Sequence, residues 1–248
     1  MSQGQAVDAV ALVGVTVSLD ADVHPASAQV VSCLGDSITN GYPYAGTGNT
    51  YPQRLLVALE AAHGPGSYDV INHGVNGYKA EDVLADLQTS NWMSEDPHLV
   101  LLMVGGNDLR TEILDPGDVA SVINQTVAEV QDIVDFVASH TNTDGTKPKI
   151  IVSACPPNLL SGPVGSLVVA LYNNKLQNDL TGIDLWIDSN WVDLYDQTTG
   201  QAQVALMFDD THPNADGYAV IAENWLAAIE FLASPRHSLY LPCVLHSP

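Results

Sequence analysis

The sequence predicts an α/β fold in which helices cover both faces of a mostly parallel, five-stranded sheet. Five short apolar segments alternate along the chain with longer segments whose apolar residues recur every three or four positions. One of the short segments, 98–106, is a continuous apolar run, as in a central strand that is buried on both faces. This alternation is typical of βαβ units, and right-handed crossovers place their helices on both sides of the sheet.

The strands are expected where runs rich in Val, Ile and Leu end at glycine, proline or polar turn residues. In chain order they are 28–35, 68–74, 98–106, 149–157 and 183–189. The helices are expected where apolar residues have helical spacing, with Asp118 as the cap of the longest one. They are 51–62, 79–87, 118–140, 164–180 and 214–233.

The domain organisation follows from where this pattern begins and ends. No long linker interrupts residues 29–233, so one domain is predicted. The N-terminal extension, 1–28, has an apolar run and an Ala-Ser-Ala site but no preceding Lys or Arg. It is either a leader remnant or an extra strand, which leaves secretion and a cytoplasmic location both open. The proline-punctuated stretch 234–248 is read as a C-terminal tail.

The composition limits the classes of partner. The chain has 248 residues, with 7 Lys+Arg against 29 Asp+Glu, for a formal net charge of −22. Such a charge repels phosphate backbones and anionic headgroups, so nucleic-acid binding is not expected. No apolar stretch is long enough to span a membrane. The oligomeric state is not predicted.

The three cysteines do not suggest a disulfide framework or a zinc site, because they are odd in number and irregularly spaced. Cys33 and Cys155 lie in strand-like apolar runs, where a buried thiol is expected. Cys243 lies in the C-terminal tail. No metal site and no cofactor are expected.

Polar residues with catalytic chemistry follow the predicted strands. Ser37 follows the first strand, Gly77 the second and Asn107 the third, while Asp209 and His212 precede the last helix. The functional crevice of such a sheet lies beyond the carboxyl ends of its strands. We therefore expect these residues, distant in sequence, to converge on one crevice.

These residue types fit nucleophilic catalysis. A serine hydroxyl needs a base to take its proton and a third group to orient that base. His212 is the candidate base, and Asp209, three residues earlier, is expected to reach the other ring nitrogen. Backbone N–H groups of Ser37 and Gly77 and the amide of Asn107 are the candidate oxyanion donors. The lack of a Cβ at Gly77 is expected to allow close approach of the backbone.

Neighbouring polar residues receive other interpretations. Asp210 is expected to form local hydrogen bonds or to face solvent. Asp36 is expected to bond nearby backbone in its turn. His73 is interpreted as an ordinary polar histidine of a loop.

Four blocks carry a resemblance to a known family. They are "GDSIT" (35–39), "NHGVNGYKAEDVL" (72–84), "VGGND" (104–108) and "DDTHPNADGY" (209–218). The chain resembles the SGNH hydrolase superfamily, the GDSL-type esterases and lipases, with Ile38 in place of the named leucine. The resemblance covers about 29–233. It implies a three-layer α/β/α, flavodoxin-like fold and metal-free hydrolysis of esters, with Ser37 as nucleophile, Asp209 and His212 completing a triad, and Ser37, Gly77 and Asn107 forming the oxyanion hole.

The expected reaction is cleavage of carboxylic esters through an acyl-enzyme. Short-chain acyl or acetyl esters are the expected substrates, with acetylated carbohydrate as a specialisation. Loops 42–50, 108–117 and 156–166 are expected to shape the acyl pocket, and no lid is evident.

Two other readings stay open from the sequence. One is a metal-dependent phosphoesterase, with ligands from Asp36, Asn107, Asp209, Asp210 and His212. The other is a non-catalytic, flavodoxin-like binding module. However, the glycine-rich loop of 35–41 matches neither dinucleotide-binding nor P-loop patterns.

Overall fold

A computed structural model describes residues 28–115 and 117–234. It contains the predicted parallel five-stranded sheet, in the order β2-β1-β3-β4-β5. The strands are β1 (Gln29–Gly35), β2 (Tyr68–Gly74), β3 (Leu99–Met103), β4 (Lys149–Ser153) and β5 (Leu185–Ile187). The predictions for the N-terminal extension and C-terminal tail, including Cys243, concern residues almost all of which lie outside the described part.

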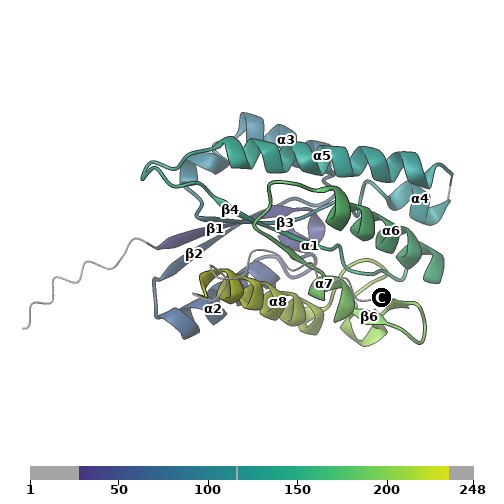
Figure 1. Cartoon of the computed structure of the whole chain (residues 1–248). Coiled ribbons are helices and arrows are strands. Elements are labelled where there is room, and N and C mark those ends of the chain that lie inside the picture. The colour runs from purple at the N-terminus through teal and green to yellow at the C-terminus, as the bar shows by residue number, and fades with distance from the viewer. Residues whose placement is uncertain (1–27, 116, 235–248) are drawn as a thin grey trace, which may run out of the picture.

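Helices lie on both sides of the sheet (Figure 1). The five predicted helices are confirmed as α2 (Tyr51–His63), α3 (Ala80–Thr89), α5 (Val119–Ser139), α6 (Pro163–Asp179) and α8 (Ala215–Ala233). The carboxylate of Asp118 caps α5, where it accepts the backbone N–H of Ser121 at 3.1 Å. No helix among the described residues is long and apolar enough to cross a membrane.

The apolar core is split into two halves by the sheet. Alternate residues of β3 point to opposite faces: Leu101 and Met103 pack with α2 and α8, while Val100 and Leu102 pack with α3, α5 and α6. All five β3 residues are buried, which explains the continuous apolar run seen in the sequence. The expected three-layer α/β/α fold is therefore present. Cys33 and Cys155 are buried, as predicted.

β3, β4 and β5 are shorter than predicted, and for β3 and β4 the reason is that burial continues past the sheet pairing. Residues 150–157 are all buried, but β4 ends at Ser153. Beyond it, the backbone N–H and C=O of Cys155 are both bonded by the side chain of Asn173, at 2.9 Å each. A side chain thus replaces a neighbouring strand as the hydrogen-bond partner, which apolar patterning does not reveal.

Several short elements were not predicted. They are α1 (Ser37–Asn40), the 3₁₀ helices Trp92–Glu95 and Val204–Leu206, α4 (Arg110–Leu114), α7 (Ser189–Val192) and the small hairpin of β6 (Tyr195–Asp196) and β7 (Gln201–Ala202). Each has five residues or fewer, which is too short for a period to show.

The strand order places a crevice at a defined point. From β1 the chain moves to β2 on one side, and β3 lies on the other side of β1. In a doubly wound sheet the ligand site lies beyond the carboxyl ends of the strands where the winding direction changes. Ser37 follows β1 and Asn107 follows β3, so both belong to this switch point.

Candidate active site

Ser37 is held in a tight turn between β1 and α1. Gly35 is required here, because a Cβ would lie 2.3 Å from both the carbonyl oxygen of Met103 and Oγ1 of Thr39. Asp36 caps α1 by accepting the backbone N–H of Ile38 at 2.9 Å, the backbone role expected for it. Ser37 is therefore the first residue of α1 and not its cap.

His212 and Asp209 complete a hydrogen-bonded line with this serine. Nε2 of His212 lies 2.9 Å from Oγ of Ser37. Nδ1 lies 2.8 Å and 3.0 Å from the two carboxylate oxygens of Asp209. Oδ1 of Asp209 also accepts the backbone N–H groups of Thr211 and His212, at 2.8 Å and 2.7 Å. The carboxylate is thus fixed by its own loop and favours the tautomer with a proton on Nδ1.

The electrostatics of Asp209 agree with this geometry. Burial alone would raise the pKa of its carboxyl, but hydrogen bonds from the ring and backbone of His212 outweigh it and lower the pKa below the ordinary value. The carboxylate therefore stays ionised beside the imidazole. The ring of Tyr42 lies against His212, with 4.7 Å between centroids.

The candidate oxyanion donors line the same cleft. This main cleft is lined by Ser37, Tyr42, Asn76, Gly77, Lys79, Asn107, Arg110, Thr111 and His212. Nδ2 of Asn107 donates one hydrogen to the carbonyl of Tyr78 at 2.9 Å. That bond fixes the amide plane and leaves the second hydrogen for another acceptor.

The structure gives a conformational reason for glycine at position 77. A Cβ there would meet no atom of the described chain within 4 Å, so space within the chain is not what requires glycine. The φ of Gly77 is +85°, in the left-handed region that other residues rarely adopt. Glycine is thus needed for the backbone conformation.

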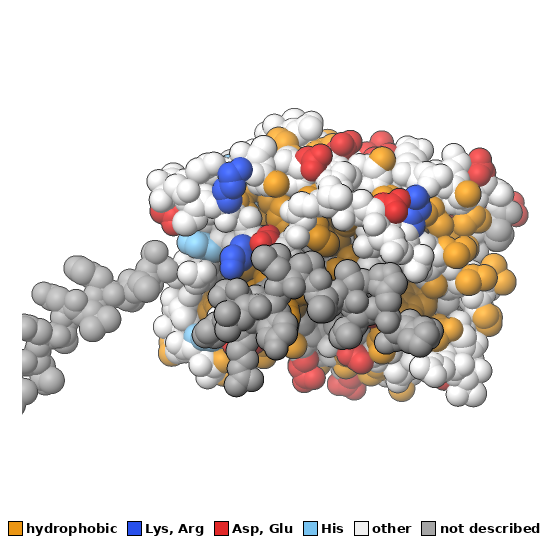
Figure 2. Space-filling view, viewed as in Figure 1, with side chains coloured by type: hydrophobic (Ala, Val, Ile, Leu, Met, Phe, Trp, Pro, Cys, Tyr) orange, Lys and Arg blue, Asp and Glu red, His pale blue; other side chains and the backbone are white. Residues whose placement is uncertain are grey.

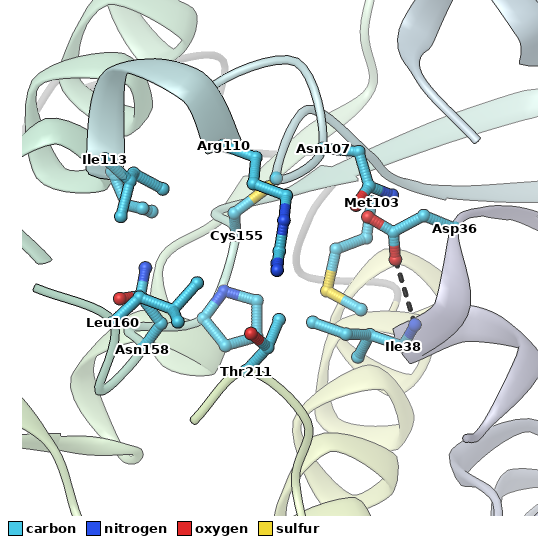
Figure 3. A pocket seen from close by; sticks show the side chains of 13 residues that line it. Asp36, Ile38, Met103, Asn107, Arg110, Ile113, Cys155, Asn158, Leu160 and Thr211 are labelled. Atoms are coloured by element: carbon cyan, nitrogen blue, oxygen red, sulfur yellow. Dashed lines mark hydrogen bonds between the residues drawn. The ribbon is translucent and has the colours of Figure 1, made fainter. Parts of the chain in front are cut away.

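A smaller side cavity of about 40 Å³ adjoins the main cleft and shares Asn107 and Arg110 with it (Figure 3). Its walls are mostly apolar, and its remaining lining residues are Asp36, Ile38, Met103, Gly106, Ile113, Cys155, Pro156, Asn158, Leu160, Val169 and Thr211. The main cleft and this cavity together include residues from all three loops that were expected to shape the acyl pocket.

Two carboxyl groups lie behind the site, that of Asp36 buried and that of Asp108 partly buried. Burial raises the pKa of Asp36 to about 7. Burial likewise raises the pKa of Asp108 to about 6, although its carboxylate accepts the backbone N–H of Ala80 at the start of α3. Asp108 thereby ties the Asn107 loop to the helix that follows Gly77.

Other predicted residues lie apart from this line. The side chain of Asp210 is exposed. His73 belongs to β2 and not to a loop: its ring stacks on Trp92, with 4.4 Å between centroids, and its Nε2 lies 2.8 Å from Glu95. It does not line the main cleft.

The phosphoesterase reading required several ligands to share a metal ion. Within residues 28–115 and 117–234, no three His, Cys, Asp or Glu side chains are grouped so that they could hold one. Asp36 is engaged with the backbone of α1, and Asp209 is engaged with His212. Two of the candidate ligands, Asp36 and Asp209, are thus committed to other partners.

Comparison with known proteins gives the family. Residues 33–220, more than half of the chain, match the model of the GDSL-like lipase/acylhydrolase family. The chain belongs to this family. The sequence-based resemblance is confirmed, and family membership makes the chain a carboxylic ester hydrolase.

Solved structures share the fold. A carbohydrate acetylesterase family member from Sinorhizobium meliloti aligns with a TM-score of 0.57 and 19% identity, over 82% of this chain and 98% of that one. An acetylxylan esterase from Geobacillus stearothermophilus, solved as a catalytic mutant, gives 0.60 and 19%, over 82% and 94%. A lipase from a goat rumen metagenome gives 0.66 and 15%, over 81% and 97%. A search of curated proteins found no match.

Three residues of the main cleft were missed individually in the sequence. No role was assigned to Tyr42, Lys79 or Arg110, although Tyr42 and Arg110 belong to loops that were expected to shape the pocket. Lys79 lies inside the block 72–84, two residues after Gly77. Arg110 lies two residues after the end of the block 104–108, so a short extension of that block would have reached it.

Proposed function

We propose that this ester hydrolase uses Ser37 as its nucleophile, His212 as the general base and acid, and Asp209 as the group that orients His212. The observation that carries this proposal is the continuous line of hydrogen bonds from Asp209 through His212 to Ser37, at 2.8 Å and 2.9 Å. Its end opens into the main cleft, which Ser37 and His212 both line.

In the acylation step, Oγ of Ser37 attacks the ester carbonyl carbon while its proton passes to Nε2 of His212. The carbonyl π electrons move to oxygen and form a tetrahedral oxyanion. When this intermediate collapses, the bond to the alcohol oxygen breaks and Nε2 returns the proton to the leaving alcohol. Asp209 stabilises the imidazolium present between these two transfers.

The oxyanion is stabilised by three donors in this proposal: the backbone N–H groups of Ser37 and Gly77 and the free hydrogen on Nδ2 of Asn107. The hydrogen bond of Asn107 to Tyr78 supports this role, because an amide that is already oriented needs no rearrangement when charge develops. The left-handed backbone at Gly77 sets the direction of its N–H in the same cleft.

Deacylation repeats the sequence with water. His212 removes a proton from the attacking water, the tetrahedral intermediate reforms, and Oγ of Ser37 leaves with the proton from Nε2. The products are the carboxylic acid and free enzyme. Every step uses groups of this chain and no added cofactor.

The preferred substrates in this proposal carry short acyl groups, acetyl above all, on an alcohol such as a carbohydrate. The side cavity of about 40 Å³ next to Asn107 suits a small apolar group better than a long chain. The main cleft is lined by polar side chains beyond the triad, including Asn76 and Thr111, which suits a hydroxylated alcohol. Two of the structural relatives described above are named as acetylesterases, which agrees with this choice.

A panel of p-nitrophenyl esters from acetate to decanoate, assayed beside acetylated xylan, tests both the choice of Ser37 as nucleophile and the preference for short acyl groups. The acetate and butyrate esters are expected to give the highest kcat/KM, and Ser37→Ala is expected to hydrolyse none above background. A maximum at long chains would overturn the short-acyl assignment. Full activity in Ser37→Ala would overturn the choice of nucleophile.

A further inference from the structure

Basic side chains are scarce in this chain, yet two of them line the main cleft. Seven Lys and Arg residues stand against 29 Asp and Glu residues. Figure 2 shows acidic side chains at several places around the edge of one face, with basic ones only in isolated places. Lys79 and Arg110 nevertheless both line the cleft that holds Ser37 and His212. Two of the seven basic residues therefore lie in the same cleft as Ser37 and His212.

Arg110 has no partner of its own among the described residues. Its side chain is exposed and forms no hydrogen bond or ion pair with the rest of residues 28–115 and 117–234. Three other cations are engaged: Arg54 donates to Asn49, Lys147 to the carbonyl of Ala138, and Lys175 to Asp179. An unpaired guanidinium in so acidic a protein is available to an external anion.

Nearby acids are committed elsewhere. Asp36, the one carboxyl group that lines the side cavity with Arg110, has Oδ1 bonded to the N–H of Ile38. Glu112, two residues along α4, is buried and accepts the N–H of Gly117 at 2.8 Å. Neither neutralises the guanidinium by a direct contact within 4.0 Å.

The direction of the Arg110 side chain places its guanidinium between the side cavity and the main cleft. Figure 3 shows Arg110 descending from its helix between Leu160 on one side and Ile38 on the other, with its guanidinium above Thr211. Arg110 lines the side cavity and the main cleft together with Asn107. A group bound by Arg110 would thus lie next to the candidate oxyanion donor.

Lys79 provides a second positive charge in the main cleft. Its side chain is exposed, and the residue is the N-cap of α3. Its charge acts on the carboxyl group of Asp108, so it is less free than Arg110. We assign it the secondary contribution.

We propose that Arg110, assisted by Lys79, binds a carboxylate carried by the ester substrate, so that the enzyme prefers anionic esters to neutral ones of the same shape. The inference rests on the proposed function, because the cations line the same cleft. A guanidinium offers two parallel N–H donors that match a carboxylate, which adds direction to charge. The net charge of −22 repels anions at long range, so a preference for them needs local cations.

Two pairs of esters test the proposal, each pair differing only in charge. For the alcohol side, the pair is meta-acetoxybenzoate and meta-acetoxybenzamide. For the acyl side, the pair is the mono-p-nitrophenyl ester of adipic acid and the corresponding ester of its monoamide. The readout is the ratio of kcat/KM for the anionic ester to that for the neutral ester, after subtraction of the uncatalysed rate.

The variants are Arg110→Gln, Lys79→Gln and the charge-matched control Lys149→Gln, whose side chain is exposed at the start of β4, at the opposite end of the sheet. Wild type is expected to prefer the anionic ester in at least one pair. Arg110→Gln is expected to lower that ratio by about five- to tenfold. Lys79→Gln is expected to lower it less, and Lys149→Gln is expected to keep the wild-type ratio.

The outcomes separate the two proposals. If wild type hydrolyses the neutral esters but shows no anionic preference in either pair, or if Arg110→Gln keeps the wild-type ratio, the carboxylate site is wrong and the esterase proposal stands. An equal loss in Lys149→Gln would also overturn the site, because the effect would then come from net charge. If wild type hydrolyses none of the four esters, the proposed function is wrong, and the inference falls with it.

Discussion

Nε2 of His212 lies 2.9 Å from Oγ of Ser37, although the two residues are 175 positions apart in the chain. Neither residue is brought there by its own element alone. Ser37 is positioned by the end of β1, while His212 lies in the loop before α8, which packs beside α2 on one face of the sheet. The parallel sheet brings the two residues together, because the loops at the carboxyl ends of its strands all lie at one edge.

Asp209 and Asp210 provide a matched pair of carboxylates. Asp209→Asn is expected to lower kcat by a factor on the order of 10² to 10⁴, because the amide no longer favours the tautomer of His212 with a proton on Nδ1. The lower end applies if the 40% exposure of the Asp209 side chain lets water replace it in part. Asp210→Asn, with the same change in charge, is expected to keep kcat within about threefold, as for surface substitutions. Steady-state assays of both variants on p-nitrophenyl acetate check this, and equal losses would contradict the assignment of Asp209.

Asn107→Ala removes a candidate oxyanion donor. The expected result is a fall in kcat by a factor of about 10² to 10³ with little change in KM, since the donor acts mainly on the charge that develops in the transition state. The control is Asn142→Ala, which also loses a side-chain bond to a backbone carbonyl, that of Pro97 at 3.0 Å, at the amino end of β3. A loss confined to KM, or equal losses of kcat in both variants, would count against the donor role.

Gly77 and Gly145 separate backbone strain from catalysis. Both have a φ near +85° and empty space where a Cβ would lie. Each Gly→Ala change is therefore expected to lower the free energy of unfolding by about 1–2 kcal/mol, the cost of a left-handed conformation for alanine. Only Gly77→Ala is expected to lower kcat as well, because Gly145 precedes β4 at the far end of the sheet. Urea unfolding and ester assays on both variants measure the two effects. A normal kcat in Gly77→Ala would contradict the assignment of the Gly77 backbone N–H as an oxyanion donor.

The raised pKa of the Asp36 carboxyl predicts that the free energy of unfolding depends on pH. Burial raises the pKa of this carboxyl to about 7 in the folded chain. Because the pKa is higher in the folded state than in the unfolded state, the folded protein binds this proton more tightly. The contribution of Asp36 to the free energy of unfolding is therefore complete below roughly pH 4 and is lost as the pH rises to about 7. The free energy of unfolding is expected to fall by about 4 kcal/mol from this group over that interval, as an order of magnitude.

Asp36→Asn is expected to flatten this part of the profile, because the amide keeps an acceptor for Ile38 but does not titrate. Asp210→Asn, an exposed carboxylate changed in the same way, serves as the control. Urea unfolding at intervals between about pH 4 and pH 8 gives the slopes. A wild-type slope retained in Asp36→Asn would show that Asp36 is ionised in the folded protein throughout this range.

The helices and strands could be predicted for one physical reason, and the candidate site for another. Apolar periodicity marked the five strands and five long helices because their buried faces repeat along many residues. The site blocks were recognisable because turn glycines and candidate catalytic side chains lie at or just after the ends of strands, as with Gly35 and Ser37.

What the sequence did not reveal depends on partners distant in the chain. The end of β4 is set by the side chain of Asn173, and the left-handed conformation of Gly77 has no signal beyond glycine itself. The importance of Arg110 lies in the absence of a partner among the described residues, and unpaired groups are visible only when all their neighbours are placed. Short helices such as α4 carry too few residues for a period.

The most direct test of the central claim is to identify the atom that attacks the substrate. Treatment with a p-nitrophenyl phosphonate, followed by mass spectrometry of the intact protein and its peptides, is expected to add one phosphonyl group at Ser37. The adduct should form in parallel with the loss of esterase activity, slow greatly in His212→Ala, and be absent from Ser37→Ala. Complete inactivation with the adduct on another residue, or an equal adduct in Ser37→Ala, would contradict the proposed mechanism.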